Sequence, residues 1–143
     1  MKRKVVIALV AVLLVAGAAL RVSAAGNEAK EKAALAAAQS WLKLIDDGNY
    51  GGSWDEAASF FKNSISREQW SQQLTAVRTP LGKKVTRTFK NATYATSLPG
   101  APDGEYVVIQ FDASFENKKV AVETVTPMLD KDGKWRVSGY YIK

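Results

Sequence analysis

The chain lacks cysteine and histidine altogether among its 143 residues. These two absences exclude disulfides, thiol nucleophiles, Ser-His triads, imidazole proton shuttles and metal sites built from histidine or cysteine. They also exclude a lipid anchor on a cysteine that follows an apolar leader. Catalysis would have to rest on carboxylates, lysine, tyrosine or serine, and we expect no metal and no other cofactor.

The N-terminal segment has the three-part layout of a secretory signal peptide. A basic start at residues 2–4 precedes an apolar run at residues 5–20, and Val22 and Ala24 supply the small side chains that a signal peptidase reads. We therefore predict cleavage before Ala25. The alternative is an uncleaved membrane anchor, but the run is shorter than the about 20 residues that a spanning helix needs.

Cleavage divides the chain into a signal peptide of residues 1–24 and a single domain of residues 25–143, which we expect in the periplasm. The whole chain has 20 basic and 14 acidic residues, a formal charge of +6, but Lys2, Arg3, Lys4 and Arg21 leave with the signal peptide. The domain keeps 16 basic against 14 acidic residues, about +2, with both signs interspersed. We expect no nucleic-acid partner. Membrane contact is expected only through an uncleaved signal segment.

The first part of the domain has a helical pattern. Leu35, Ala38, Leu42 and Ile45 recur at helical spacing, which predicts a helix over residues 27–47 that ends before a glycine.

Two capping-box patterns then indicate further helix starts. Ser53 pairs with Glu56, and Ser66 with Gln69, at the spacing that lets two side chains satisfy free backbone N–H groups. The second of these helices is expected to stop before Pro80.

Alternating apolar residues replace the helical pattern in the second half. They predict strands over residues 83–96, 105–115, 118–129 and 134–142. Pro127 cannot donate a ladder hydrogen bond, so we expect an edge or a bulge there. Helices followed by four consecutive strands predict an α+β fold, with N-terminal helices packed on a curved four-stranded antiparallel sheet.

The register decides which residues face the helices. A two-residue loop at residues 116–117 would set Phe111 opposite Val122 and, in the next hairpin, Val122 beside Tyr141. The face turned away from the helices would then hold Tyr106, Val108, Gln110, Asp112, Glu123, Val125, Arg136, Ser138, Tyr140 and Ile142.

Candidate contacts to a ligand or partner come from two places, and no catalytic or metal-binding residue is predicted. The candidates are Trp54, Trp70, Tyr106, Gln110, Glu123 and Tyr140. The tryptophans begin short helices beside a glycine-rich break, although large aromatic side chains more often fill a core. The other four lie on the outer sheet face, a half-apolar, half-charged surface suited to a protein partner or a homodimer. We interpret Asp46 and Asp47 as solvated loop residues.

Several short segments carry a family resemblance. They are WLKLIDDGNY at 41–50, SW at 53–54, PLG at 80–82, LPGAPDGEY at 98–106, ETVT at 123–126 and GYYI at 139–142. Together they resemble the bacterial family called domain of unknown function 4019, over about residues 35–143. The resemblance implies a bacterial exported domain, and the helices followed by a curved sheet also resemble the cystatin-like or NTF2-like cone. That family has no established activity, so no catalytic residue follows from it.

These observations predict an exported, periplasmic, non-enzymatic module that binds a small ligand or a periplasmic protein. One alternative is a small NTF2-like lyase or isomerase with a carboxylate base in an apolar cavity. Another is an inhibitor of an exported enzyme, which rests on the cystatin-like shape. A cavity around a desolvated carboxylate would favour the enzyme, and an interior filled by tryptophan and phenylalanine would argue against it.

Overall fold

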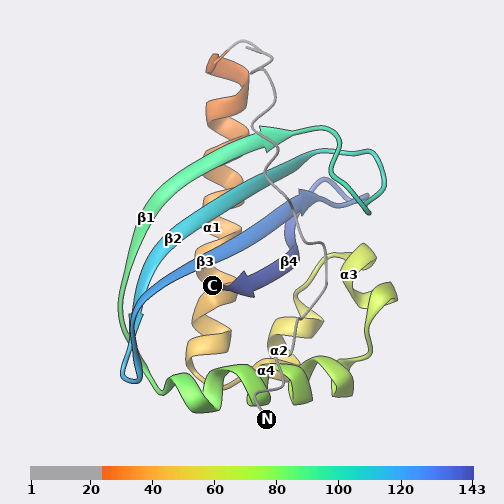
Figure 1. Ribbon diagram of the computed structural model, residues 1–143. Coiled ribbons are helices and arrows are strands. Elements are labelled where there is room, and N and C mark those ends of the chain that lie inside the picture. Colours follow the sequence, from red (N-terminus) through yellow and green to blue (C-terminus); the bar gives the residue numbers. More distant parts are fainter. Residues whose placement is uncertain (1–23) are drawn as a thin grey trace.

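The computed structural model describes residues 24–143, in which four helices precede one four-stranded sheet (Figure 1). This confirms the predicted α+β class. The predicted signal peptide lies almost wholly outside the described residues and stays a prediction. Within residues 24–143, no helix is both long enough and apolar enough to cross a membrane.

Helix α1, Ala24–Asp46, lies along the side of the sheet toward which the strands curve (Figure 1). Its buried residues are Ala34, Ala38, Trp41, Leu42 and Ile45. Small side chains in the N-terminal half of this stripe let the helix approach the sheet closely, and larger ones follow toward its C-terminus. Gly48, with φ +77°, then reverses the chain in a conformation that few other residues adopt.

The short helices α2, Tyr50–Asp55, and α3, Ser59–Ser64, correct one prediction. Ser53 does not cap a helix: α2 begins earlier, and its N-cap is Asn49, whose side chain accepts a hydrogen bond from Gly52 N at 3.0 Å. A Cβ on Gly52 would stand 2.4 Å from the Asn49 side chain, so this cap requires glycine there. Ser53 lies inside α2, where its hydroxyl donates to Tyr50 O at 2.6 Å.

Helix α4, Arg67–Leu81, begins at the predicted capping box. Ser66 Oγ accepts from Gln69 N at 3.1 Å, and Gln69 Oε1 accepts from Ser66 N at 3.2 Å. The helix runs two residues further than expected, because Pro80 lies in the last turn and costs only one backbone hydrogen bond there. Gly82, with φ +74°, ends it.

Strands β1, Lys84–Ala95, β2, Tyr106–Phe115, β3, Lys118–Leu129, and β4, Trp135–Ile142, form an antiparallel meander in the order β1-β2-β3-β4. The sheet bends around α1, while α2, α3 and α4 gather at one end of it (Figure 1). This arrangement confirms the predicted helices on a curved four-stranded sheet.

The predicted register is wrong by one residue between β2 and β3. Phe111 pairs with Glu123, not with Val122. The cause is an extra residue in β3: two residues, Lys119 and Val120, lie opposite the single residue Ser114 of β2. The loop itself has the expected length, since Phe115 pairs with Lys118. A one-residue slip moves every later side chain of the strand to the opposite face.

A second irregularity lies between β3 and β4. Thr126 pairs with Gly139 and Pro127 with Val137, so Ser138 is the extra residue of a bulge beside the proline. This confirms the bulge expected at Pro127, which has no N–H to donate. The turn between the strands also departs from the predicted register by one residue, since Trp135 pairs with Leu129. Together the two shifts pair Tyr141 with Thr124 instead of Val122.

These register shifts correct the predicted composition of the outer face. Four residues assigned to it belong to the helix-covered inner face: Glu123, Val125, Tyr140 and Ile142. Val125 pairs with Ile109 and Tyr140 with Val125, and all three lie in the main core with residues of α1 and α4.

Aromatic rings fill much of the space between the helices and the sheet. Trp70 meets Phe61 edge-on with 4.8 Å between ring centroids, and Trp41 meets Tyr140 in the same way at 5.3 Å. Each such pair adds about 0.5–1.5 kcal/mol to the burial of its apolar area. A smaller cluster of Leu98, Tyr106 and Val108 lies outside this main core.

Candidate functional site

The two predicted tryptophans hold the helical end of the domain together. Trp70 is fully buried, and its Nε1 donates to Ser53 Oγ at 2.9 Å. Trp54 is half-buried, donates from Nε1 to Ile65 O at 2.8 Å, and has Lys62 Nζ 5.8 Å from its ring centroid. Both indole N–H groups are therefore used within the fold, and a binding role for these rings stays a prediction.

Tyr106 and Gln110 lie on the outer face, as predicted, but in different surroundings. Tyr106 is 1% exposed, and its hydroxyl donates to Pro102 O at 2.5 Å, so the segment between β1 and β2 covers it. Burial, followed by the charge of Asp103, raises the pKa of Tyr106. Gln110 is half-buried and accepts a hydrogen bond from Asn91 Nδ2 at 3.2 Å.

Glu123 and Tyr140 lie together in the interior. The Glu123 side chain is 0% exposed, and it accepts hydrogen bonds from Arg87 Nε at 2.6 Å and Arg87 Nη2 at 3.1 Å. The Tyr140 hydroxyl donates to Glu123 Oε2, the oxygen that also accepts from Arg87 Nη2. Burial above all, and then the charge of Glu123, raise the pKa of Tyr140 well above its usual value. Glu123 is therefore a bound, ion-paired carboxylate.

Arg87 joins this pair to the end of α1. It donates to Asp46 from Nη1 at 2.7 Å and from Nη2 at 3.0 Å, so one guanidinium bridges two carboxylates. Burial raises the pKa of Asp46, but the hydrogen bonds and charges of Arg87 and Arg78 outweigh it and hold the pKa below its usual range. Asp46 is thus an ion-pair partner at the core boundary, which corrects its interpretation as a solvated loop residue.

Arg78 completes the network from α4. Its side chain is 5% exposed, its Nη2 donates to Asp46 Oδ1 at 3.2 Å, and its guanidinium carbon lies 4.9 Å from the ring centroid of Phe115. We call Asp46, Arg78, Arg87, Glu123 and Tyr140 the buried ion network. Lys84 Nζ also approaches Asp46, at 3.9 Å. The two carboxylates of the network are therefore contacted by three cationic side chains, those of Arg78, Lys84 and Arg87.

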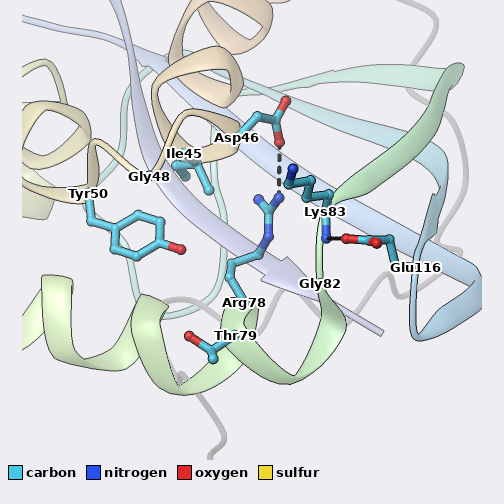
Figure 2. A pocket seen from close by; sticks show the side chains of 9 residues that line it. All are labelled: Ile45, Asp46, Gly48, Tyr50, Arg78, Thr79, Gly82, Lys83 and Glu116. Carbon is cyan, nitrogen blue, oxygen red and sulfur yellow. Dashed lines mark hydrogen bonds and ion pairs between the residues drawn. The ribbon is translucent and has the colours of Figure 1, made fainter.

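An open pocket of about 240 Å³ lies beside this network, between the ends of α1 and α4 and the start of β1 (Figure 2). Its lining residues are Ile45, Asp46, Gly48, Tyr50, Arg78, Thr79, Gly82, Lys83 and Glu116. Figure 2 shows the Arg78 side chain rising from α4 toward Asp46, with the Tyr50 hydroxyl pointing toward it from across the pocket. None of the six predicted contact residues lines this pocket.

Strand β1 forms an open edge of the sheet. It is hydrogen-bonded to β2 on one side, and no described strand pairs with its other side. Val85 is 58% exposed and Phe89 is 48% exposed, although both are large and apolar. The Phe89 ring meets Phe111 edge-on on the inner face, with 6.3 Å between ring centroids. We call the unpaired side of β1, together with Val85 and Phe89, the β1 edge.

One family profile covers the part of the chain that holds these features. The profile described as "Protein of unknown function (DUF4019)" matches residues 37–140. The chain belongs to the DUF4019 family. The resemblance seen in the sequence is thereby confirmed. Comparison with curated proteins and with solved structures gives no match.

The matched part of this DUF4019 chain begins inside α1 and ends at Tyr140, so it holds the whole buried ion network, the pocket and β1. Among the described residues, no three histidine, cysteine, aspartate or glutamate side chains are grouped to hold a metal ion. The features of the DUF4019 domain that could contact a ligand or partner are paired charges, a polar pocket and an exposed strand.

Sequence reasoning missed both arginines of the network, although two signals were present. Arg78 follows Trp70 and Leu74 at intervals of four residues and so continues the buried stripe of α4. Arg87 pairs with Ala113, a residue that the alternation of β2 had already placed on the inner face.

Proposed function

We propose that this protein is an exported, periplasmic, non-enzymatic interaction module, and that its β1 edge binds an extended acidic segment of a partner protein. The observation that carries the proposal is the exposure of Val85 and Phe89 on an edge strand. Unpaired edge strands bind peptides by adding a further strand to the sheet, with side-chain contacts giving specificity.

The charge of the edge favours an acidic partner. Residues 83–102 contain Lys83, Lys84, Arg87 and Lys90 but no aspartate or glutamate. Arg87 is directed inward and neutralised. The lysines are exposed, and Lys84 and Lys90 make only long contacts, each 3.9 Å, to Asp46 and Asp112. Exposed charges of one sign attract an oppositely charged partner and raise its association rate, an effect that salt weakens.

The same features disfavour a second copy of this chain as the occupant. Two β1 strands paired with each other would bring lysines against lysines, and like charges opposite one another destabilise strand pairs. Bulges at Val85 and Lys90 further limit regular pairing, as on many protected edges. The regular stretch from Asn91 to Ala95 is left for a partner strand, with Phe89 as its apolar neighbour.

The interior supports binding over catalysis. A lyase or isomerase would need its carboxylate base to face a cavity, but Glu123 is paired with Arg87 and does not line the pocket. Trp41 and Tyr140 pack against each other in this part of the core. The inhibitor of an exported enzyme is one form of protein binding and falls within the proposal.

A labelled peptide of alternating glutamate and valine, titrated into the purified protein at low salt, tests the β1 edge. We expect saturable binding that Phe89→Ser weakens about tenfold, because an apolar contact is lost. Lys90→Glu should weaken binding about fivefold and flatten its salt dependence.

The matched control is Lys131→Glu, which reverses an exposed charge in the turn between β3 and β4. It should bind the peptide as the original protein does. If Lys90→Glu and Lys131→Glu lost equal affinity for the peptide, binding would depend only on net charge. That result would contradict the β1 edge as the binding site. Size measurement in the same buffers provides the other test, because a concentration-dependent dimer broken by Phe89→Ser would identify a second copy as the occupant.

Export rests on the basic start and apolar run of the N-terminal segment. The mass of the protein recovered from the periplasmic fraction of bacteria that produce it tests this part. We expect a chain beginning at Ala25. An intact chain in the membrane fraction would support an anchor, and an intact chain in the cytoplasm would contradict export.

A further inference from the structure

The pocket beside the buried ion network contains an incompletely paired cation. Arg78 Nε and Nη1 are buried, and neither has a hydrogen-bond partner among the described residues. A guanidinium carries five N–H donors, and leaving buried donors of a charged group unpaired is costly. Only Nη2 is bound, at 3.2 Å to Asp46.

Asp46 cannot fully compensate Arg78, because Arg87 holds both of its oxygens. The two Arg87 contacts, at 2.7 and 3.0 Å, are shorter than the single Arg78 contact. Glu123, the other buried carboxylate, is bonded to Arg87 and Tyr140. The network therefore has room for one more negative charge on the Arg78 side.

We propose that the pocket lined by Tyr50, Arg78 and Thr79 binds a small carboxylate ligand, with the Arg78 guanidinium as its anchor. A planar carboxylate matches the fork of N–H groups on a guanidinium better than other anions do. The hydroxyls of Tyr50 and Thr79 line the same pocket and are suited to donate to the ligand (Figure 2).

The size of the pocket sets an upper limit on the ligand. At about 240 Å³ it is smaller than the about 300–1,000 Å³ typical of drug-sized ligands, but far larger than one water. Glu116 also lines the pocket, and its Oε1 accepts from Lys83 N at 2.6 Å, which places a negative group at the rim. This group disfavours polyanions, so monocarboxylates and dicarboxylates of few carbons fit best.

The experiment is a titration of the purified protein with sodium acetate, sodium succinate and inorganic phosphate, at constant ionic strength. The arginine Nε–H resonance of Arg78 in ¹H–¹⁵N spectra reports on the anchor directly. We expect a saturable shift with at least one carboxylate, and weaker binding of phosphate. A shift without saturation for every probe, or tighter binding of phosphate than of both carboxylates, would overturn the proposal.

Two variants distinguish specific binding in the pocket from attraction to positive charge in general. Tyr50→Phe keeps the ring in place and should weaken carboxylate binding about fivefold, because a single hydrogen bond is lost. Arg78→Lys keeps the charge without the fork and should weaken it about tenfold or more. Arg67→Lys, at an exposed arginine paired with Asp55, is the control and should bind normally.

Neither Tyr50 nor Arg78 lies on β1, so Tyr50→Phe should leave binding of the acidic peptide unchanged. Unchanged carboxylate binding in folded Tyr50→Phe and Arg78→Lys would contradict the pocket while leaving the β1 edge untouched.

Discussion

Strands β1 and β4 are the two edges of one sheet, yet their surroundings differ along most of their length. The four central residues of β4, from Val137 to Tyr140, are buried, whereas most of β1 is exposed. Ala58, between α2 and α3, donates its N–H to Val137 O at 2.8 Å, so the helical end of the domain covers β4. No described strand pairs with the outward side of β1.

The difference indicates that exposure of β1 is not a general property of edges in this fold. This domain covers the β4 edge with its own helices and leaves the β1 edge open. Lysines and two bulges in β1 limit its pairing with a second copy. Arg87 shares the inner face of β1 with Phe89, Ala92 and Tyr94, and its side chain holds two carboxylates there.

The largest loss of stability is expected from substitution of Arg87, the β1 residue that holds the two carboxylates of the buried ion network. Arg87→Met leaves Glu123 buried without its cation, and breaking a buried pair in this way costs about 3–5 kcal/mol of unfolding free energy. Arg67→Met removes an arginine from an exposed pair with Asp55 and should cost at most about 1 kcal/mol. Urea unfolding of both variants provides the measurement. Equal losses would mean that the buried ion network contributes no more than a surface pair.

A matched pair of valines compares the two edges directly. Val137→Ala in β4 removes two buried methyl groups and should cost about 2 kcal/mol, whereas Val85→Ala in β1 should cost less than about 0.5 kcal/mol. Thermal or urea unfolding decides between these values. A loss at Val85 as large as that at Val137 would show that β1 is covered in solution.

A smaller effect should appear in the pH dependence of stability. The folded-state pKa of Asp46 is lowered, so its ion pairs stabilise the fold above the unfolded-state pKa of about 3.9 and are lost as pH falls through the folded value. Asp46→Asn should therefore be less stable than the original protein near pH 7, and the gap should narrow in acid. Unfolding free energies measured from pH 7 downward test this, and a constant gap would contradict it.

Local sequence patterns predicted most of the helices and strands, but they did not predict the register between the strands. The α1 stripe, the capping box at Ser66 and the bulge at Pro127 are each encoded by neighbouring residues. The extra residue near Val120 leaves no comparable signal, because Lys119 and Val120 are both exposed and either face would accept them. That one residue moved Glu123 from the outer face to the interior, and the bulge at Ser138 sets Tyr140 on the same inner face.

The start of α2 was missed for a related reason. Gly51 and Gly52 are poor helix formers, so the sequence favoured a break where the chain forms a helical turn. Tertiary contacts override the propensity: Ser53 accepts the Trp70 N–H, and Trp41 Nε1 donates to Ser53 O at 2.7 Å. The pocket and the buried ion network depend on these long-range contacts, which no short segment encodes.

The central claim is that β1, and not β4, receives a partner strand. Backbone hydrogen exchange of the purified protein, measured with and without the peptide of alternating glutamate and valine, tests it most directly. We expect the peptide to slow exchange in β1, foremost from Asn91 to Ala95, while exchange in β4 stays the same. Unchanged exchange in β1 at a peptide concentration that saturates binding would contradict the account.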